Sequence, residues 1–223
     1  MEKPKILVWD LPTRAFHWLL AGSFVGAFLT AESERYRDVH VMLGYTTLGL
    51  IAFRVLWGFV GTRYARFNSF TFSMRKVSEY LRSLLARDPA HYVGHNPAGS
   101  WAIYALLVLG VLTGISGYAT YEELGGDRLG ALHEALGNAM LGIVMLHIAG
   151  VVLSGFLHRE NLVKAMLTGY KRGDASDGIV GRRSVVAGLL VVTTVVFWAG
   201  GFDDWFGTPT ATKPAQQATD GDH

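Results

Sequence analysis

The chain has 223 residues, of which 50% are hydrophobic and only 17% are charged. Soluble domains carry about 25% charged residues, so this composition excludes an ordinary soluble domain and indicates an integral membrane protein. The formal net charge is only +2, and no basic stripe with interleaved aromatic residues is present, which argues against a nucleic-acid partner. The lack of cysteine excludes disulfides, iron–sulfur clusters held by cysteine and covalently attached c-type haem.

Five apolar segments are predicted to cross a bilayer as helices, because each approaches the roughly 20 residues that span its hydrocarbon core. In chain order they are residues 16–31, 39–60, 100–118, 132–157 and 185–202. The first follows Lys3, Lys5 and Arg14 and could be read as a signal peptide. No good small-x-small cleavage site follows it, so we expect this segment to be retained as a span.

Basic residues collect on one side of these predicted spans. They lie before the first span, between the second and third, and after the fourth, and include Arg14, Arg63, Arg82, Arg159 and Arg172. The positive-inside rule therefore predicts a cytoplasmic N-terminus and a periplasmic, disordered tail at residues 203–223. In the longest loop, residues 70–85 have the pattern of a basic amphipathic helix, either lying on the inner surface or serving as a packed connector.

Two histidines share one face of the fourth predicted span. His133 and His147 are fourteen residues apart. Fourteen residues turn a helix through about 1400° and advance it by about 21 Å, so the two rings leave nearly the same face at two depths of the membrane. The direction of the other spans places His17 at the inner level with His147, and His40 at the outer level with His133.

Histidine inside a bilayer is costly and usually functional, and a haem with two axial imidazoles needs one histidine from each of two facing helices at matched depth. The chain supplies this arrangement twice. We therefore predict two b-type haems, an inner one ligated by His17 and His147 and an outer one ligated by His40 and His133. Zinc fits less well, because it needs three or four converging ligands whereas these pairs are about 21 Å apart.

Small residues and arginines accompany the predicted ligands. A small residue follows each histidine by three or four positions, which leaves room for a porphyrin: Ala21, Gly44, Gly137 and Gly150. Arg54 lies fourteen residues after His40 on the same face, so it is predicted to bind the propionates of the inner haem, unless it extends only to the lipid headgroups. Arg35 and Arg37 are predicted to bind those of the outer haem.

Two further histidines are ambiguous. His158 follows His147 by eleven residues on nearly the same face, where it would either touch a quinone or a propionate or anchor the helix at the interface. His95 precedes Asn96 and Pro97, which form a helix-start signal, and is assigned no role of its own.

Residues 8–18 read VWDLPTRAFHW, residues 54–67 read RVLWGFVGTRYARF and residues 94–99 read GHNPAG. Together these motifs resemble the bacterial cytochrome b561 family, which includes the b-type cytochrome subunits of nickel–iron hydrogenases. The resemblance covers residues 6–172 and implies a four-helix bundle with two b haems, paired as depth predicts. It leaves residues 173–202 as a linker and an extra helix that departs from the family plan, followed by the tail.

The expected fold is thus an all-α integral membrane protein of a bacterial inner membrane, a four-helix transmembrane dihaem bundle with a fifth C-terminal helix. The resemblance implies electron transfer between a quinone and a periplasmic redox partner, which would be a hydrogenase, a dehydrogenase or a c-type cytochrome. Two alternatives stay open. One is a quinone-linked superoxide oxidase, in which Arg35, Arg37 and Arg128 would attract the anion. The other is a haem-free membrane anchor whose histidines only bridge helices.

Overall fold

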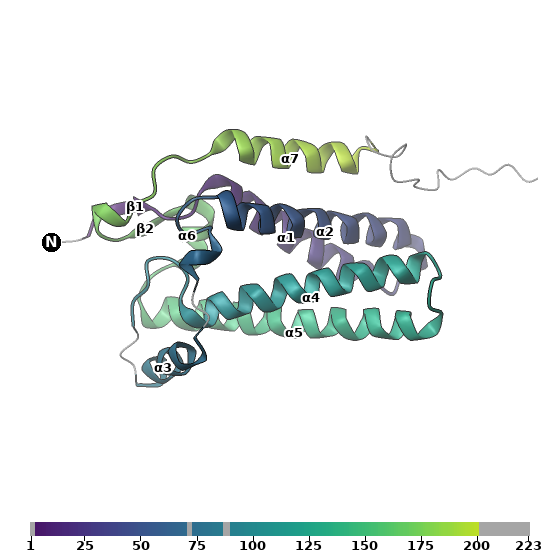
Figure 1. Ribbon diagram of the computed structural model, residues 1–223, viewed down its shortest axis with the longest axis horizontal. Helices are drawn as coiled ribbons and strands as arrows, with labels where there is room; N and C mark the ends of the chain where they lie inside the picture. Colours follow the sequence, from purple (N-terminus) through teal and green to yellow (C-terminus); the bar gives the residue numbers. More distant parts are fainter. Residues whose placement is uncertain (1–2, 71–72, 87–89, 201–223) are drawn as a thin grey trace, which may run out of the picture.

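The computed structural model describes residues 3–70, 73–86 and 90–200. Within these ranges the protein is mostly helical, with a small two-stranded sheet at one end (Figure 1). Helices form at all five predicted spans: α1 (Leu11–Thr30), α2 (Arg37–Val60), α4 (Pro97–Tyr121), α5 (Asp127–Leu157) and α7 (Ser184–Trp198). The end of the last predicted span and the predicted disordered tail, residues 201–223, lie outside the described residues.

Three helical segments are long and apolar enough to cross a membrane: Glu34–Val60, Pro97–Tyr121 and Asp127–Leu157. Their surfaces expose large apolar side chains such as Val108 and Phe156, as expected of helices in contact with lipid. Helix α7 is apolar but has only 15 residues, and α1 carries Arg14 and His17 in its first turns. The prediction of an all-helical membrane protein is therefore confirmed, while a total of five spans stays a prediction.

The long helices pack as two pairs. Helix α1 packs on α2, and α4 packs on α5, while a narrower contact between α2 and α4 joins the pairs. Helix α7 lies against the outside of α1 (Figure 1). Among the long helices of the described ranges, α5 packs closely only on α4, so its approach to α1 and α2 is made through side chains.

A short antiparallel sheet joins the start of the chain to the segment after α5. Strand β1 (Lys5–Leu7) pairs with β2 (Tyr170–Arg172), and Ile6 lies opposite Lys171. The adjoining helix α6 (Leu162–Thr168) ends at Gly169, whose φ of +89° lies in the left-handed region. A Cβ at Gly169 would also lie 2.7 Å from the Trp9 carbonyl oxygen, so glycine is required there.

Helix α3 (Met74–Leu85) lies within the segment for which the sequence predicts an amphipathic helix. Its Arg75 and Lys76 are exposed, whereas Tyr80 is buried. The Tyr80 hydroxyl shares a hydrogen bond of 3.1 Å with Ser154 Oγ of α5 and accepts one of 3.0 Å from Asn96 Nδ2. Because this buried tyrosine is fixed to the bundle, α3 is a packed connector that also presents a basic outer face.

Asp10 fixes the start of α1 against the end of α2. Its side chain is 1% exposed and accepts three hydrogen bonds. One comes from the Thr13 backbone N–H (2.8 Å), which caps α1, and the others come from Trp57 Nε1 (3.1 Å) and Thr62 Oγ1 (2.7 Å). Asp10 of the motif at residues 8–18 is thus hydrogen-bonded to Trp57 and Thr62 of the motif at residues 54–67, in one buried network.

Replacing Asp10 with asparagine is expected to lower the free energy of unfolding by about 1–3 kcal/mol, because an amide cannot accept all three bonds and leaves a buried donor unpaired. Thermal unfolding of the purified protein in detergent measures this loss. Asp174→Asn is the matched control, since the Asp174 side chain is 63% exposed and, within the described ranges, pairs with the similarly exposed Lys3 alone. Equal destabilisation by both substitutions would contradict a structural role for the Asp10 network.

Candidate functional site

The outer pair of histidines meets between the two helix pairs. The ring centroids of His40 on α2 and His133 on α5 are 6.0 Å apart, and the ring planes are perpendicular at 90°. A metal ion held by two imidazole nitrogens at about 2 Å each places the ring centres roughly 6 Å apart, once the radius of each ring is added. The two rings are therefore spaced as two axial ligands of one iron would be.

Backbone carbonyls of neighbouring helices orient both rings. His40 Nδ1 lies 2.8 Å from the Ala27 carbonyl oxygen on α1, and His133 Nδ1 lies 2.9 Å from the Thr113 carbonyl oxygen on α4. A carbonyl oxygen only accepts hydrogen bonds, so each Nδ1 must carry the proton. This leaves Nε2 with its lone pair, which is the tautomer needed for metal ligation through Nε2.

Glycines leave space along the helices that carry these ligands. A Cβ at Gly44 or Gly137, each four residues after an outer histidine, would meet no atom within 4 Å. On α4, a Cβ at Gly117 would lie 2.8 Å from a carbon of the His133 ring. The first two glycines thus border open space on the helix faces that carry the ligands, and the third lets the His133 ring lie close against α4.

The inner pair of histidines is carried by α1 and α5. His147 on α5 acts electrostatically on His17 on α1, and the His17 and Trp18 rings form a T-shaped pair with their centroids 5.0 Å apart. His17 Nδ1 is buried without a hydrogen-bond partner in the described part of the chain. A buried polar atom left unsatisfied calls for a partner from outside the chain, and a bound group would supply it.

Arg54 is buried on α2, near Asp10 and Tyr104. It is 3% exposed, and its guanidinium carbon lies 5.0 Å and 5.6 Å from the ring centroids of Phe67 and Phe70. Its Nη1 has no hydrogen-bond partner among the described residues. Burying a cation is costly unless an anion balances it. The Asp10 carboxylate and the two aromatic faces supply part of that balance, and the unpartnered Nη1 is one donor that a further anionic group would satisfy.

His95 is a candidate that the sequence reasoning missed. The predicted helix start is confirmed, because Asn96 Oδ1 caps α4 by accepting the Gly99 N–H at 2.7 Å. The His95 ring, however, packs between Trp9 and Phe70, each 4.6 Å away, and interacts electrostatically with Arg54 and His147. Burial, together with the Arg54 cation, lowers the pKa of the His95 imidazole to about 3, so the ring is neutral at physiological pH. Its Nδ1 is buried and unpaired among the described residues.

The arginines predicted for the outer haem lie at the opposite end of the bundle. Arg35 belongs to a short 3₁₀ helix (Glu34–Tyr36), where its guanidinium lies 5.5 Å from the Tyr36 ring centroid. Arg37 is the first residue of α2, one turn before His40. Both side chains are exposed. Their role in binding a propionate stays a prediction.

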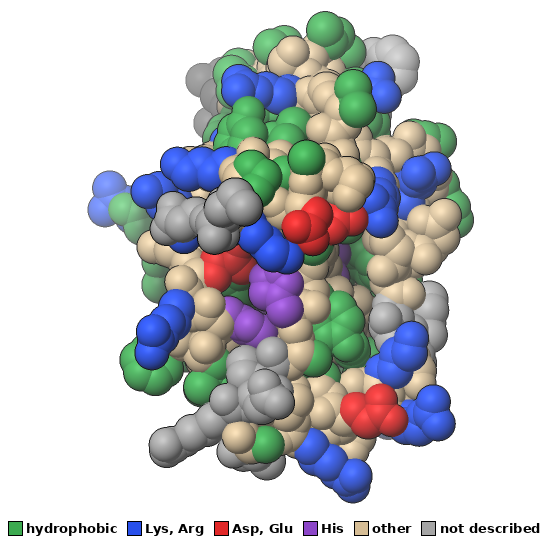
Figure 2. Space-filling view, turned by 90° about the vertical axis from the view of Figure 1, so that its left-hand side faces the viewer, with side chains coloured by type: hydrophobic (Ala, Val, Ile, Leu, Met, Phe, Trp, Pro, Cys, Tyr) green, Lys and Arg blue, Asp and Glu red, His purple; other side chains and the backbone are tan. Residues whose placement is uncertain are grey.

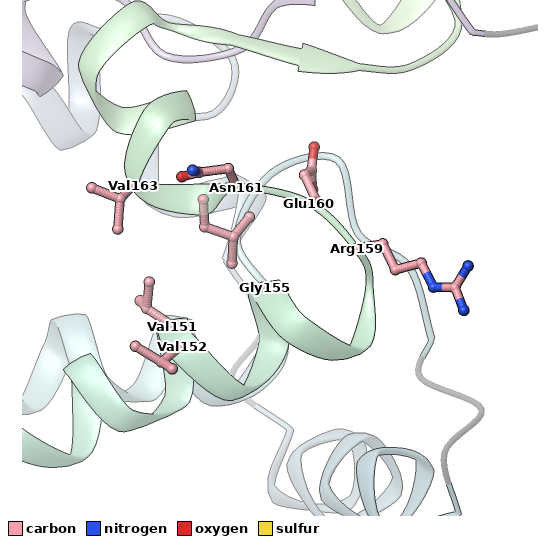
Figure 3. Close-up of a pocket in the computed structure, with 8 residues that line it drawn as sticks. Val151, Val152, Gly155, Arg159, Glu160, Asn161 and Val163 are labelled. Carbon is pink, nitrogen blue, oxygen red and sulfur yellow. The ribbon is translucent and has the colours of Figure 1, made fainter.

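A separate hollow lies where α5 turns into α6 (Figure 3). Val151 and Val152 on α5 face Val163 on α6 across it, and the Arg159 guanidinium points away. Its volume is about 340 Å³ and no candidate haem ligand lines it. The nearby His158 instead packs its ring against His91, with centroids 5.7 Å apart. A contact of His158 with a quinone or a propionate, or its role as an interfacial anchor, stays a prediction.

Comparison with known proteins gives a consistent result. Residues 8–169 match the model of the family described as prokaryotic cytochrome b561. The chain is 26% identical to a protein of Rhizobium leguminosarum bv. viciae and 29% identical to one of Azotobacter vinelandii, each over 76% of this chain and 90% of the relative. Both relatives are named "Probable Ni/Fe-hydrogenase B-type cytochrome subunit".

A relative from Escherichia coli (strain K12), named "Probable Ni/Fe-hydrogenase 1 B-type cytochrome subunit", is 28% identical over 52% of this chain and 60% of its own length. No solved structure matches the chain. The matched region contains all four histidines predicted as ligands, as well as Arg54 and His95.

Proposed function

The chain belongs to the prokaryotic cytochrome b561 family, and we propose that it is a dihaem b-type cytochrome that carries electrons between a quinone in the bacterial inner membrane and a periplasmic nickel–iron hydrogenase. Family membership supports the b-type haem and the membrane setting. The names of the relatives support the hydrogenase partner. The single observation that supports the dihaem proposal is the outer pair, His40 and His133, whose rings lie 6.0 Å apart and each bond a backbone carbonyl through Nδ1, so that the two residues would hold one iron between them.

In this proposal the outer haem is held by His40 and His133 and the inner one by His17 and His147. The haem irons would supply reversible one-electron chemistry when bound. The chain would contribute the imidazole nitrogens that hold the irons, and it fixes the outer rings by hydrogen bonds to backbone carbonyls. Because the two ligands on α5 are fourteen residues apart, they lie at levels separated by about 21 Å of helix rise. Two such levels would let electrons cross most of the hydrocarbon core, which is about 30 Å thick.

Arg54 and His95 would bind the propionates of the inner haem. Both side chains are enclosed by aromatic rings and carry a buried nitrogen with no partner in the described residues. The Arg54 cation offers a charge-assisted hydrogen bond to a carboxylate, and neutral His95 offers a ring N–H. Arg35, in the 3₁₀ helix before α2, and Arg37, the first residue of α2, would play the corresponding role for the outer haem.

The charge distribution supports the proposed orientation. The end of the molecule with β1, α3 and α6 shows many Lys and Arg side chains and few acidic ones (Figure 2). By the positive-inside rule this end would face the cytoplasm. The pair His40 and His133 would then lie near the periplasm, where the hydrogenase partner would exchange electrons with it.

Two haem b per chain are expected in the purified full-length protein. A reduced-minus-oxidised spectrum gives the haem type, and the ratio of haem to protein gives the stoichiometry. A colourless preparation would favour the haem-free anchor, and a ratio of about one would contradict the dihaem proposal.

The partner is tested separately from the haems. Affinity-tagged protein isolated from its native membrane is expected to retain a hydrogenase, and the isolated complex should reduce an added quinone when supplied with hydrogen. Superoxide-dependent quinone reduction by the isolated chain, with no hydrogenase retained, would contradict the hydrogenase proposal and favour the superoxide oxidase alternative.

A further inference from the structure

We propose that a hollow between the end of α2 and the start of α7 binds the phosphate headgroup of an anionic phospholipid. The hollow has a volume of about 440 Å³ and is formed by two segments distant in the sequence, residues 60–66 and 178–183. Three arginines line it, Arg63, Arg66 and Arg183, and none of the lining residues is acidic. This inference concerns a surface of the chain that the proposed haem sites do not use.

The positive charge at the hollow is largely uncompensated. Arg63 is partly engaged, because its Nη1 lies 3.6 Å from a carboxylate oxygen of Asp177 and its guanidinium lies 5.3 Å from the centroid of the Tyr64 ring. Arg66 and Arg183 are exposed and pair with no acidic side chain in the described ranges. Guanidinium groups bind phosphate oxygens in a two-pronged geometry, so two unpaired arginines on one hollow favour a phosphate ligand.

The backbone at Arg183 is held in an unfavourable conformation. Its φ of 54° and ψ of 40° lie in the left-handed region, which costs free energy for any residue with a Cβ. Arg183 occupies the N-cap position of α7, and no side chain caps that helix start. The first-turn N–H groups of α7 therefore begin directly beside the hollow and add a partial positive charge to that of the arginines.

Exposed valines line the hollow or follow it directly in the sequence. Val60 at the end of α2 is 76% exposed, Val180 is 91% exposed and Val185 in the first turn of α7 is 75% exposed. Cations beside exposed apolar side chains match a lipid, with its phosphate on the arginines and its acyl chains on the valines. A soluble phosphate would gain nothing from the valines.

A lipid at this place would attach the near end of α7 to α2. The far end of α7 is already fixed, because Trp198 Nε1 donates a 2.9 Å hydrogen bond to Thr46 Oγ1 of α2. Between these points α7 packs on α1. The headgroup would thus link the two helix ends through the arginines that follow α2 and precede α7.

The test uses the full-length protein in nanodiscs of phosphatidylcholine with and without phosphatidylglycerol, with bound lipid counted by native mass spectrometry after release into detergent. The wild type is expected to retain one phosphatidylglycerol. The double variant Arg66→Gln/Arg183→Asn should bind it about tenfold or more weakly, because each lost cation removes about 1 kcal/mol of headgroup attraction. Asparagine tolerates the left-handed backbone, so this variant should still fold.

The matched control, Arg75→Gln/Lys76→Gln, removes the same charge from the exposed face of α3 and should leave retention unchanged. Equal loss in both double variants would show diffuse attraction to the basic end and overturn the proposal. Inorganic phosphate tests the other source of the same chemistry. Saturable phosphate binding to the protein in phosphatidylcholine nanodiscs, abolished by the first double variant, without selective retention of phosphatidylglycerol would overturn the lipid assignment.

Discussion

Replacing His147 with alanine is expected to remove the inner haem and to leave most of the outer haem in place. The substitution leaves His17 as the only proposed axial ligand at the inner level. The outer ligand His133 lies about 21 Å from His147 along the axis of α5. The rings of the outer pair are held by their own hydrogen bonds to the carbonyl oxygens of Ala27 and Thr113. The haem-to-protein ratio should therefore fall from about two to about one, while the remaining spectrum should be that of the outer haem.

His133→Ala is the reciprocal variant and should leave the inner haem instead, so redox titration of the two proteins should give two different midpoint potentials. His158→Ala is the matched control, because His158 follows α5 directly and its ring packs on His91 rather than on a proposed ligand. It should retain both haems. Loss of both haems from His147→Ala in a protein that still folds would contradict two independent sites.

The positions of the long helices and the depth of the histidines could be predicted because helix geometry converts sequence spacing directly into depth and direction. Spacing alone places His133 and His147 on one face of the helix at two different depths. The structure places the His133 ring against the His40 ring. That these histidines ligate haem stays a prediction. Asn96 and Pro97 likewise act locally at a helix start, where a short motif suffices.

Features that depend on long-range packing were not predictable from the sequence. Strand β1 has three residues, too few for a period-two pattern, and is stabilised by pairing with β2 near the other end of the matched region. The enclosure of Arg54 by Phe67 and Phe70 depends on how the loop after α2 folds back. His95 lies in a loop, so helix periodicity could not predict its depth in the membrane. Its position just before an apolar helix could still have suggested that the side chain is buried.

Replacing Gly137 with leucine is expected to exclude the outer haem while leaving the protein folded. Gly137 follows His133 by four residues, so it lies on nearly the same face of α5, and a Cβ there would meet no atom within 4 Å. In the protein without haem the larger side chain therefore has room, and leucine favours a helix by up to about 1 kcal/mol relative to glycine. With haem bound, the leucine would occupy the space proposed for the porphyrin beside His133.

The matched control is Gly142→Leu, which makes the same substitution on the same helix. Gly142 is nine residues from His133, so it lies on the opposite face of α5, where it is exposed and a Cβ would also meet no atom within 4 Å. Gly137→Leu should therefore retain about one haem per chain and Gly142→Leu about two, with both proteins equally helical by circular dichroism. A ratio of two haems per chain in Gly137→Leu would mean that no porphyrin occupies the open space beside His133. One haem in both variants would mean that α5 tolerates no added bulk, so only the difference between the two variants supports the proposed position of the haem.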